Sequence, residues 1–171
     1  MTAPRVGEAD PEDAAAPASR VVVLGWGNTA RGDDGLGPML LDRIAGLGLA
    51  HVETIEDFQL QLEHALDLQT ADLALFVDAS VAAPAPFSFE EVFPRAGRSH
   101  TSHAMAPEAV LDVHVRVLGR APPPAFVLGM RGERFELGEG LGEEARPHLH
   151  AALDFVAPLP AQPDPDARRA A

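Results

Sequence analysis

The stretch VVVLGWGNTARGDDGLG at positions 21–37 decides the fold. It opens with residues 21–24, an uninterrupted and mostly β-branched apolar run that is typical of a strand buried on both faces of a parallel sheet. A glycine-rich loop comes next, and the apolar spacing of residues 37–44, with a proline near the first turn, predicts a helix. A strand, a loop and a helix in this order indicate the start of a βαβ unit.

Strands and helices are expected to alternate along the rest of the chain. Strands are predicted over 51–55, over the apolar segments 73–77 and 125–130, and at an edge of the sheet over 87–93, and helices are predicted over 60–68 and 143–155. Together these elements predict a three-layer α/β fold with helices on both faces of a sheet. Residues 111–117 alternate strictly, which favours a strand, whereas Pro107 and Gly119 are placed to open and close a helix, so both structures stay open there.

The two ends of the chain differ in composition from its middle. Residues 1–19 and 158–171 are rich in alanine and proline and carry little apolar bulk, which predicts disordered tails. Residues 20–157 are then expected to form a single domain, which is large enough to bury a core without disulfides or a structural metal.

Composition excludes several classes of protein. The chain has no cysteine, which excludes thiol catalysis and cysteine-ligated metals, and all 13 of its basic residues are arginine, so the lysine of a P-loop or a Schiff-base enzyme is missing. A net charge of −13 argues against binding to nucleic acid or to an anionic membrane surface. No membrane-spanning run or signal-peptide pattern is evident, so we expect a cytoplasmic protein.

The glycine loop partly matches a dinucleotide-binding fingerprint. Gly25, Gly27 and Ala30 fit the pattern G-x-G-x-x-A directly after a strand. For backbone amides to hold a pyrophosphate, a helix would have to begin at residues 28–31, and the sequence shows no helical character there. In addition, the carboxylates of Asp33 and Asp34 would repel that anion. Dinucleotide binding therefore remains an alternative rather than the first hypothesis.

Acidic side chains follow two of the expected strands. Asp34 belongs to the glycine loop and Asp78 ends the strand over 73–77, so both are expected at the carboxyl edge of the sheet, where ligand sites of open α/β folds gather. His100 and His103 come from the loop after the edge strand. Each residue could instead be an ordinary turn or cap residue. Two carboxylates and an imidazole could hold a transition metal such as nickel or zinc. The sequence lacks the zinc-protease signature His-Glu-x-x-His and the nucleophile elbow Gly-x-Ser-x-Gly.

The sequence resembles the nickel–iron hydrogenase maturation proteases over essentially all of residues 20–157. The similar stretches, in order, are residues 22–28, 32–37, 76–79, 102–103 with 110–111, and 126–129. This resemblance implies a twisted, mainly parallel five-stranded sheet, and it makes residues 111–118 helical.

The resemblance also implies an activity and its residues. Members of the family are endopeptidases that remove a C-terminal extension from the hydrogenase large-subunit precursor once nickel has been delivered to it. The metal-site and catalytic residues correspond here to Asp34, Asp78 and His103, whereas Asp33 is expected to hold the loop together. Nickel is expected to arrive with the precursor rather than as a resident cofactor. A nickel chaperone that cuts nothing is a further alternative, and the remaining histidines are expected to be surface or cap residues: His51, His64, His114, His148 and His150.

One segment departs from the family pattern. Many members have an Asp-Gly-Gly-Thr-like stretch after the second strand, associated with choice of the precursor, where this chain reads EDFQLQ at 56–61. Asp57, Phe58 and Gln59 are therefore candidate substrate-recognition residues, and similar Asp-Phe-Gln variants occur in proteases of soluble, NAD-linked hydrogenases. Phe58 could be an exposed anchor for the precursor or the first core residue of a helix that buries Leu62, Ala65 and Leu66.

Overall fold

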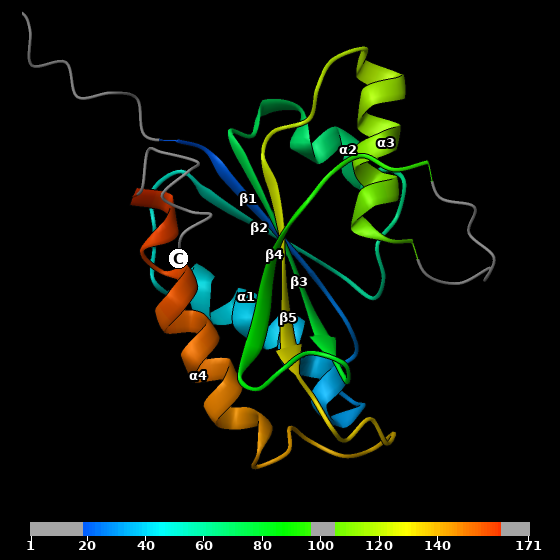
Figure 1. The fold of residues 1–171 in the computed structure, drawn as a ribbon. Helices are drawn as coiled ribbons and strands as arrows, with labels where there is room; N and C mark the ends of the chain where they lie inside the picture. The colour runs from blue at the N-terminus through cyan, green and yellow to red at the C-terminus, as the bar shows by residue number, and fades with distance from the viewer. Residues whose placement is uncertain (1–18, 97–104, 162–171) are drawn as a thin grey trace, which may run out of the picture.

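The computed structural model describes residues 19–96 and 105–161, which are built around a five-stranded sheet with strand order β2-β1-β3-β5-β4 (Figure 1). The parallel strands are β1 (Val21–Trp26), β2 (Val52–Asp57), β3 (Leu73–Ser80) and β5 (Ala125–Arg131). The strand β4 (Phe87–Val92) pairs antiparallel with β5 at the edge. The expected mainly parallel five-stranded sheet is confirmed.

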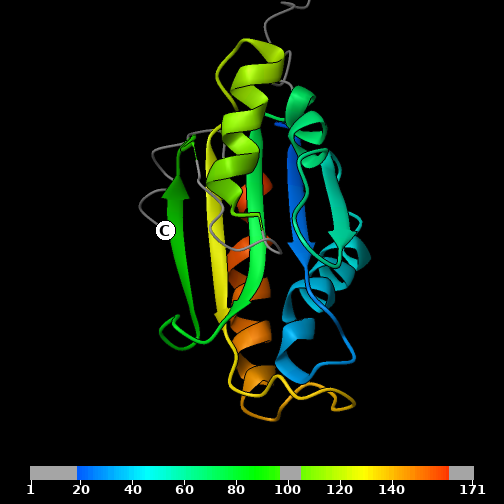
Figure 2. The ribbon, with the colours of Figure 1, turned by 90° about the vertical axis from the view of Figure 1, so that its right-hand side faces the viewer.

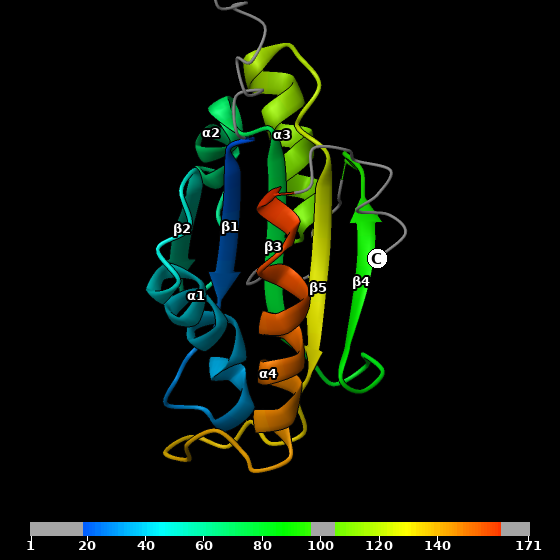
Figure 3. The same cartoon turned by 90° about the vertical axis from the view of Figure 1, so that its left-hand side faces the viewer.

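Helices cover both faces of this sheet. The face shown in Figure 3 carries α1 (Leu36–Gly46) and α4 (Ala145–Val156). The opposite face carries α2 (His64–Asp67) and α3 (Pro107–Leu118), which lie toward the amino-terminal ends of the parallel strands (Figure 2). Three short 3-10 helices complete the described chain: η1 (Gly32–Gly35), η2 (Leu68–Thr70) and η3 (Leu159–Ala161). No helix in the described ranges is long and apolar enough to cross a membrane.

Alternate residues of β1 enter two different cores. Val21 and Val23 pack with α1 and α4, whereas Val22 and Leu24 pack with the residues of α2 and α3, and all four side chains are buried. A strand in a half-solvated sheet would alternate apolar and polar residues, but a strand covered on both faces cannot. The uninterrupted apolar run at 21–24 follows from this position near the centre of the sheet.

The ambiguous segment 111–117 is helical. It lies in α3, where Pro107 stands in the first turn and Gly119 ends the helix in the left-handed conformation, with a φ of 65°. Val110, Leu111 and His114 are its buried residues. His114 is 1% exposed and donates from Nδ1 to the Ala65 carbonyl oxygen at 2.9 Å, so of the two expected roles, surface or cap residue, the surface role was wrong.

The expected helix over 60–68 is shorter than predicted. Only α2 is α-helical, and Leu62 and Leu66 are 50% and 51% exposed rather than packed in the core. Ala65 is buried as expected, but its buried partners are Leu60 and Leu68. Turns precede α2, and the Gln61 amide there donates to the His64 side chain. The apolar spacing of this segment is typical of a helical face, but turns before α2 place its apolar side chains differently from a continuous helix.

The folded domain extends past residue 157. Leu159, in η3, is 3% exposed and belongs to the core formed with α1 and α4, although it was expected to lie in a tail. Most residues of the expected tails, 1–18 and 162–171, lie outside the described residues.

Replacing this buried side chain should destabilise the protein. We expect Leu159→Ala to lower the free energy of unfolding by about 2–3 kcal/mol, because it removes buried methyl groups and leaves a cavity. Leu137→Ala is the matched control, since Leu137 is 77% exposed and its truncation should change stability by less than about 0.5 kcal/mol. Urea unfolding of both variants measures the two effects, and equal stabilities would contradict the extended boundary.

Candidate active site

The carboxyl ends of β1, β2 and β3 bring three acidic segments to one edge of the sheet. Asp34 lies in η1, the turn between β1 and α1, Asp57 is the last residue of β2, and Asp78 lies near the end of β3. The register pairs Trp26 with Asp57 and Gly25 with Val77, so these ends are neighbours. The edge expected to carry the site therefore does collect Asp34, Asp57 and Asp78.

Glycines allow the loop after β1 to fold tightly against η1. Gly27 has a φ of 137°, and a side chain there would collide with the Asp34 carbonyl oxygen. A Cβ at Gly37 would collide with the Trp26 carbonyl oxygen. These close backbone approaches explain why the motif needs glycine, and they bring Asp34 back toward the end of β1.

The amides of the glycine loop are occupied by the protein itself. The Asn28 amide donates to Asp34 Oδ2 at 3.0 Å, the Gly27 amide to the Asp57 carbonyl oxygen at 3.2 Å, and the Ala30 amide to Asn28 Oδ1 at 2.9 Å. A dinucleotide fingerprint works by offering such amides to a pyrophosphate. Here a carboxylate occupies the anion's position at Asn28, which argues against dinucleotide binding.

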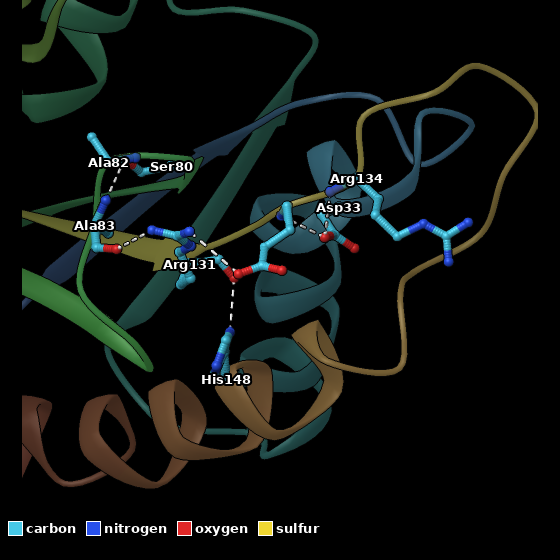
Figure 4. Close-up of polar contacts among 8 residues, drawn as sticks. Asp33, Ser80, Ala82, Ala83, Arg131, Arg134 and His148 are labelled. Carbon is cyan, nitrogen blue, oxygen red and sulfur yellow. Dashed lines mark hydrogen bonds and ion pairs between the residues drawn. The ribbon is translucent and has the colours of Figure 1, made fainter.

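Asp33 fastens η1 to the loop that follows β5 (Figure 4). Its Oδ2 accepts hydrogen bonds from the Glu133 amide at 2.8 Å and the Arg134 amide at 3.0 Å, and its Oδ1 accepts one from the Gly142 amide at 2.8 Å. The side chain is turned away from solvent, since Asp33 is only 2% exposed. The expectation that Asp33 holds the loop together agrees with these contacts, which engage both of its carboxylate oxygens, whereas Asp34 accepts the Asn28 amide at one oxygen.

The pKa of Asp78 is shifted toward neutrality. Burial raises it most, and the negative charge of Asp34 raises it further, while hydrogen bonds from the Ala79 amide and the Trp26 side chain lower it; the resulting pKa is about 7. The amide bond from Ala79 to Oδ1 measures 2.8 Å. A carboxyl group with this pKa can take up and release a proton at neutral pH, as general acid–base catalysis requires.

The chain is similar to proteins of known structure. No family model and no curated protein matches the sequence. Among solved structures, the chain is similar to the maturation protease HycI from Thermococcus kodakarensis KOD1, with a TM-score of 0.65 and 21% identity over 84% of this chain and 94% of that one. The chain has the fold of the [NiFe] hydrogenase maturation proteases. The resemblance seen in the sequence is confirmed at this level.

Two further structures support the same fold. The hydrogenase 2 maturation peptidase from Thaumarchaeota archaeon SCGC_AB-539-E09 is 26% identical, with a TM-score of 0.59 over 80% of this chain and 95% of that one. The maturating endopeptidase HybD from E. coli is 21% identical, with a TM-score of 0.62 over 80% and 89% of the two chains. The likeness spans nearly the whole of each known protein, so it concerns the complete maturation-protease fold.

The third expected metal ligand cannot be placed beside the two carboxylates. His103 and its alternative His100 both lie outside the described residues. Within residues 19–96 and 105–161, no three His, Cys, Asp or Glu side chains gather in a way that could hold a metal ion. The described residues thus bring two of the three expected ligands, Asp34 and Asp78, to the same edge of the sheet.

The expected recognition segment begins where β2 ends. Asp57 is partly buried, whereas Phe58 and Gln59 are exposed, and a hollow of about 200 Å³ is lined by Gly27, Glu56, Asp57 and Phe58. Phe58 is 77% exposed, so it is not a core residue of the following helix. Gly27 also contacts Asp34, which makes the hollow a neighbour of the carboxylate site.

The exposure of Phe58 predicts a small effect on stability. We expect Phe58→Ala to change the free energy of unfolding by less than about 0.5 kcal/mol, because the ring buries little of its surface when the protein folds. Phe126→Ala is the comparison, since Phe126 is 2% exposed and its truncation should cost about 3–5 kcal/mol. Guanidinium unfolding compares the two, and a similar loss in both variants would show that Phe58 belongs to the core.

Sequence reasoning missed two side chains near this edge. Trp26, within the quoted motif, lowers the pKa of Asp78 through its side chain, and His64 is 8% exposed rather than a surface residue. His64 Nε2 lies 3.5 Å from Asp57 Oδ2. The signal for Trp26 was its position in the glycine-rich motif, two residues after the apolar run at 21–24. For His64 the sequence carried no such signal, because the turn that buries it is not visible in the apolar pattern.

Proposed function

We propose that this protein is a cytoplasmic endopeptidase that removes the C-terminal extension of a nickel-loaded [NiFe] hydrogenase large-subunit precursor. Asp34, Asp78 and His103 are the residues that recognise the precursor's nickel and support hydrolysis. The observation that carries the proposal is the pairing of Asp34 with Asp78 at the carboxyl edge of a fold shared with hydrogenase maturation proteases.

The electrostatics of the pair favour a cationic ligand. Burial and, to a smaller extent, the charge of Asp34 disfavour the ionised form of Asp78, which is why the pKa of Asp78 is raised. A divalent cation between the carboxylates would relieve that repulsion and stabilise both charges. The pair leaves other coordination positions open, so it suits recognition of a metal that another protein already holds. Nickel is therefore part of the substrate in this proposal.

Asp78 is also the residue best suited to move protons during hydrolysis. Its carboxylate can take a proton from the attacking water and give it to the amide nitrogen that leaves, because its pKa lies near neutrality. Asp33 has a different role: its oxygens are taken by three backbone amides, and it keeps η1 and hence Asp34 in position. Catalysis in this proposal uses water as the nucleophile and forms no covalent intermediate with the protein.

Choice of the precursor is assigned to the segment after β2. Phe58 and Gln59 are exposed beside the carboxylate site, and an exposed aromatic ring is a frequent anchor in protein interfaces. The Asp-Phe-Gln sequence favours the precursor of a soluble, NAD-linked hydrogenase as partner.

Intact-mass measurement of the nickel-loaded precursor tests the proposal. Mixing with the protein should lower the precursor's mass by that of its C-terminal extension, and nickel-free precursor should stay uncut. A chaperone would change the nickel content of the precursor without changing its polypeptide mass. Tight binding of NADH with an uncut precursor would favour the dinucleotide alternative and overturn the proposal.

A further inference from the structure

His64 lies in a defined orientation beneath the segment after β2. The residue is 8% exposed, and its Nδ1 is 3.0 Å from the backbone nitrogen of Gln61. A backbone amide can only donate, so Nδ1 accepts this bond and the proton of the neutral ring is on Nε2. Nε2–H then faces Asp57 Oδ2 at 3.5 Å, an electrostatic contact that is longer than a hydrogen bond.

The carboxylate of Asp57 is engaged by its own segment. Its Oδ1 accepts the Phe58 amide at 2.6 Å, and its Oδ2 accepts Gln61 Nε2 at 2.7 Å and faces His64. These contacts leave Asp57 poorly placed to bind a substrate group directly. They instead close residues 57–64 into a turn whose conformation depends on His64 and Gln61.

This turn presents Phe58 to solvent beside the carboxylate site. The Asp57 carbonyl oxygen accepts the Gly27 amide at 3.2 Å, which ties the turn to the glycine loop that carries Asp34. The ring of Phe58 stands at the hollow of about 200 Å³ formed between the glycine loop and the end of β2. A precursor segment entering the site from this side would meet Phe58 before it reached Asp34.

We propose that His64 is a positioning residue for precursor binding: through Asp57 it holds Phe58 at the rim of this hollow. The inference rests on the proposed function, and it assigns to Asp57 an indirect role in recognition. Because Phe58 is not one of the groups proposed to act on the cleaved bond, we expect the effect on precursor affinity rather than on the chemical step.

Two substitutions separate the contacts that His64 makes. His64→Asn keeps an acceptor for the Gln61 amide but loses the donor that faces Asp57, whereas His64→Gln can restore a donor at the position of Nε2. We expect His64→Asn to raise KM for the nickel-loaded precursor about tenfold with little change in kcat, and His64→Gln to stay within about twofold of the original KM. His150→Asn, at an exposed position of α4, is the control and should leave both constants unchanged.

A double-mutant cycle distinguishes positioning from a general structural role. If His64 acts through Phe58, then His64→Asn should have almost no further effect on KM in a Phe58→Ala background. Gln61→Ala removes the other side-chain donor to Asp57 from an exposed position, and it gives the same readout should His64→Asn fail to fold.

The outcomes are separable from those of the proposed function. If the original protein leaves the precursor uncut, the proposed function fails and this inference fails with it. If it cuts the precursor, an unchanged KM in Gln61→Ala and His64→Asn overturns the inference alone. An equal KM effect with and without Phe58, or a loss confined to kcat, also overturns it.

Discussion

Asp78→Asn is expected to lose hydrolytic activity while gaining stability. We expect kcat/KM for the precursor to fall by about 10²–10⁴-fold, because an amide cannot accept the proton of the attacking water. The free energy of unfolding at pH 8 should rise by up to about 3 kcal/mol, because the substitution removes a partly buried charge that Asp34 repels. A residue that serves the reaction at a cost to the fold should behave in this way.

The sign of the pH dependence follows from the direction of the shift. The folded-state pKa of Asp78, about 7, lies above the ordinary value of 3.8, so between these values the folded protein holds a proton that the unfolded chain has released. The contribution of Asp78 to stability is present below pH 3.8 and is lost as the pH rises through about 7. The advantage of Asp78→Asn should therefore be large at pH 8 and small at pH 4.

Thermal unfolding at both pH values, with product mass as the activity readout, measures these effects. Asp42→Asn is a suitable control because Asp42 is exposed on α1. The activity and stability of this variant should match those of the original protein at either pH. An Asp78→Asn variant that cleaves the precursor normally would remove Asp78 from the reaction. One that is less stable at pH 8 would show that the charged carboxylate stabilises the fold.

Asp33→Ala is expected to be among the most destabilising substitutions in the chain. It would leave the amides of Glu133, Arg134 and Gly142 without their acceptor, and we expect a loss of about 3–5 kcal/mol. Activity should fall together with stability, since η1 and Asp34 lose their attachment to the loop after β5. Asp42→Ala is the matched control and should change stability by less than about 0.5 kcal/mol.

The loss caused by Asp33→Ala should itself depend on pH. Burial raises the pKa of Asp33, but the three amides and Arg134 lower it more, so the folded-state pKa lies below the ordinary 3.8. The stabilisation is then present above pH 3.8 and is lost as the pH falls through the folded-state value. Urea unfolding should find the difference between the two proteins constant from pH 5 to 7 and smaller in stronger acid. A difference that grows below pH 3.8 would contradict the assignment.

The central strands β1, β3 and β5 could be predicted from sequence because burial on both faces of the sheet imposes largely continuous apolar runs on them. The run at 21–24 therefore predicted the strand β1. The position of Asp78 directly after the apolar run 73–77 predicted that this residue lies at the carboxyl edge of the sheet. The segment 111–117 was ambiguous because a helix half-covered by the sheet can alternate apolar and polar residues over two turns. Its helical state was indicated by the family resemblance and not by the local pattern.

The parts that sequence reasoning missed depend on contacts between distant segments. The buried side chain of His114 donates a hydrogen bond to the Ala65 carbonyl oxygen and so connects α3 to α2. The sequence pattern of neither helix predicts this contact. His64 and Leu62 were misassigned for a related reason: the turn after β2 is fixed by side-chain bonds to Asp57 and by the Gln61 amide, which apolar periodicity does not record. The role of Asp33 was predicted, but its three amide partners, about a hundred residues away, were not.

The central claim is that this protein cuts the precursor catalytically and uses Asp78 to do so. The most direct test is the intact mass of nickel-loaded large-subunit precursor after incubation with substoichiometric amounts of the protein or of Asp78→Asn. The account predicts complete conversion to a species lacking the C-terminal extension in the first case and unchanged precursor in the second. Unchanged precursor in both, or equal conversion by the two proteins, would contradict it.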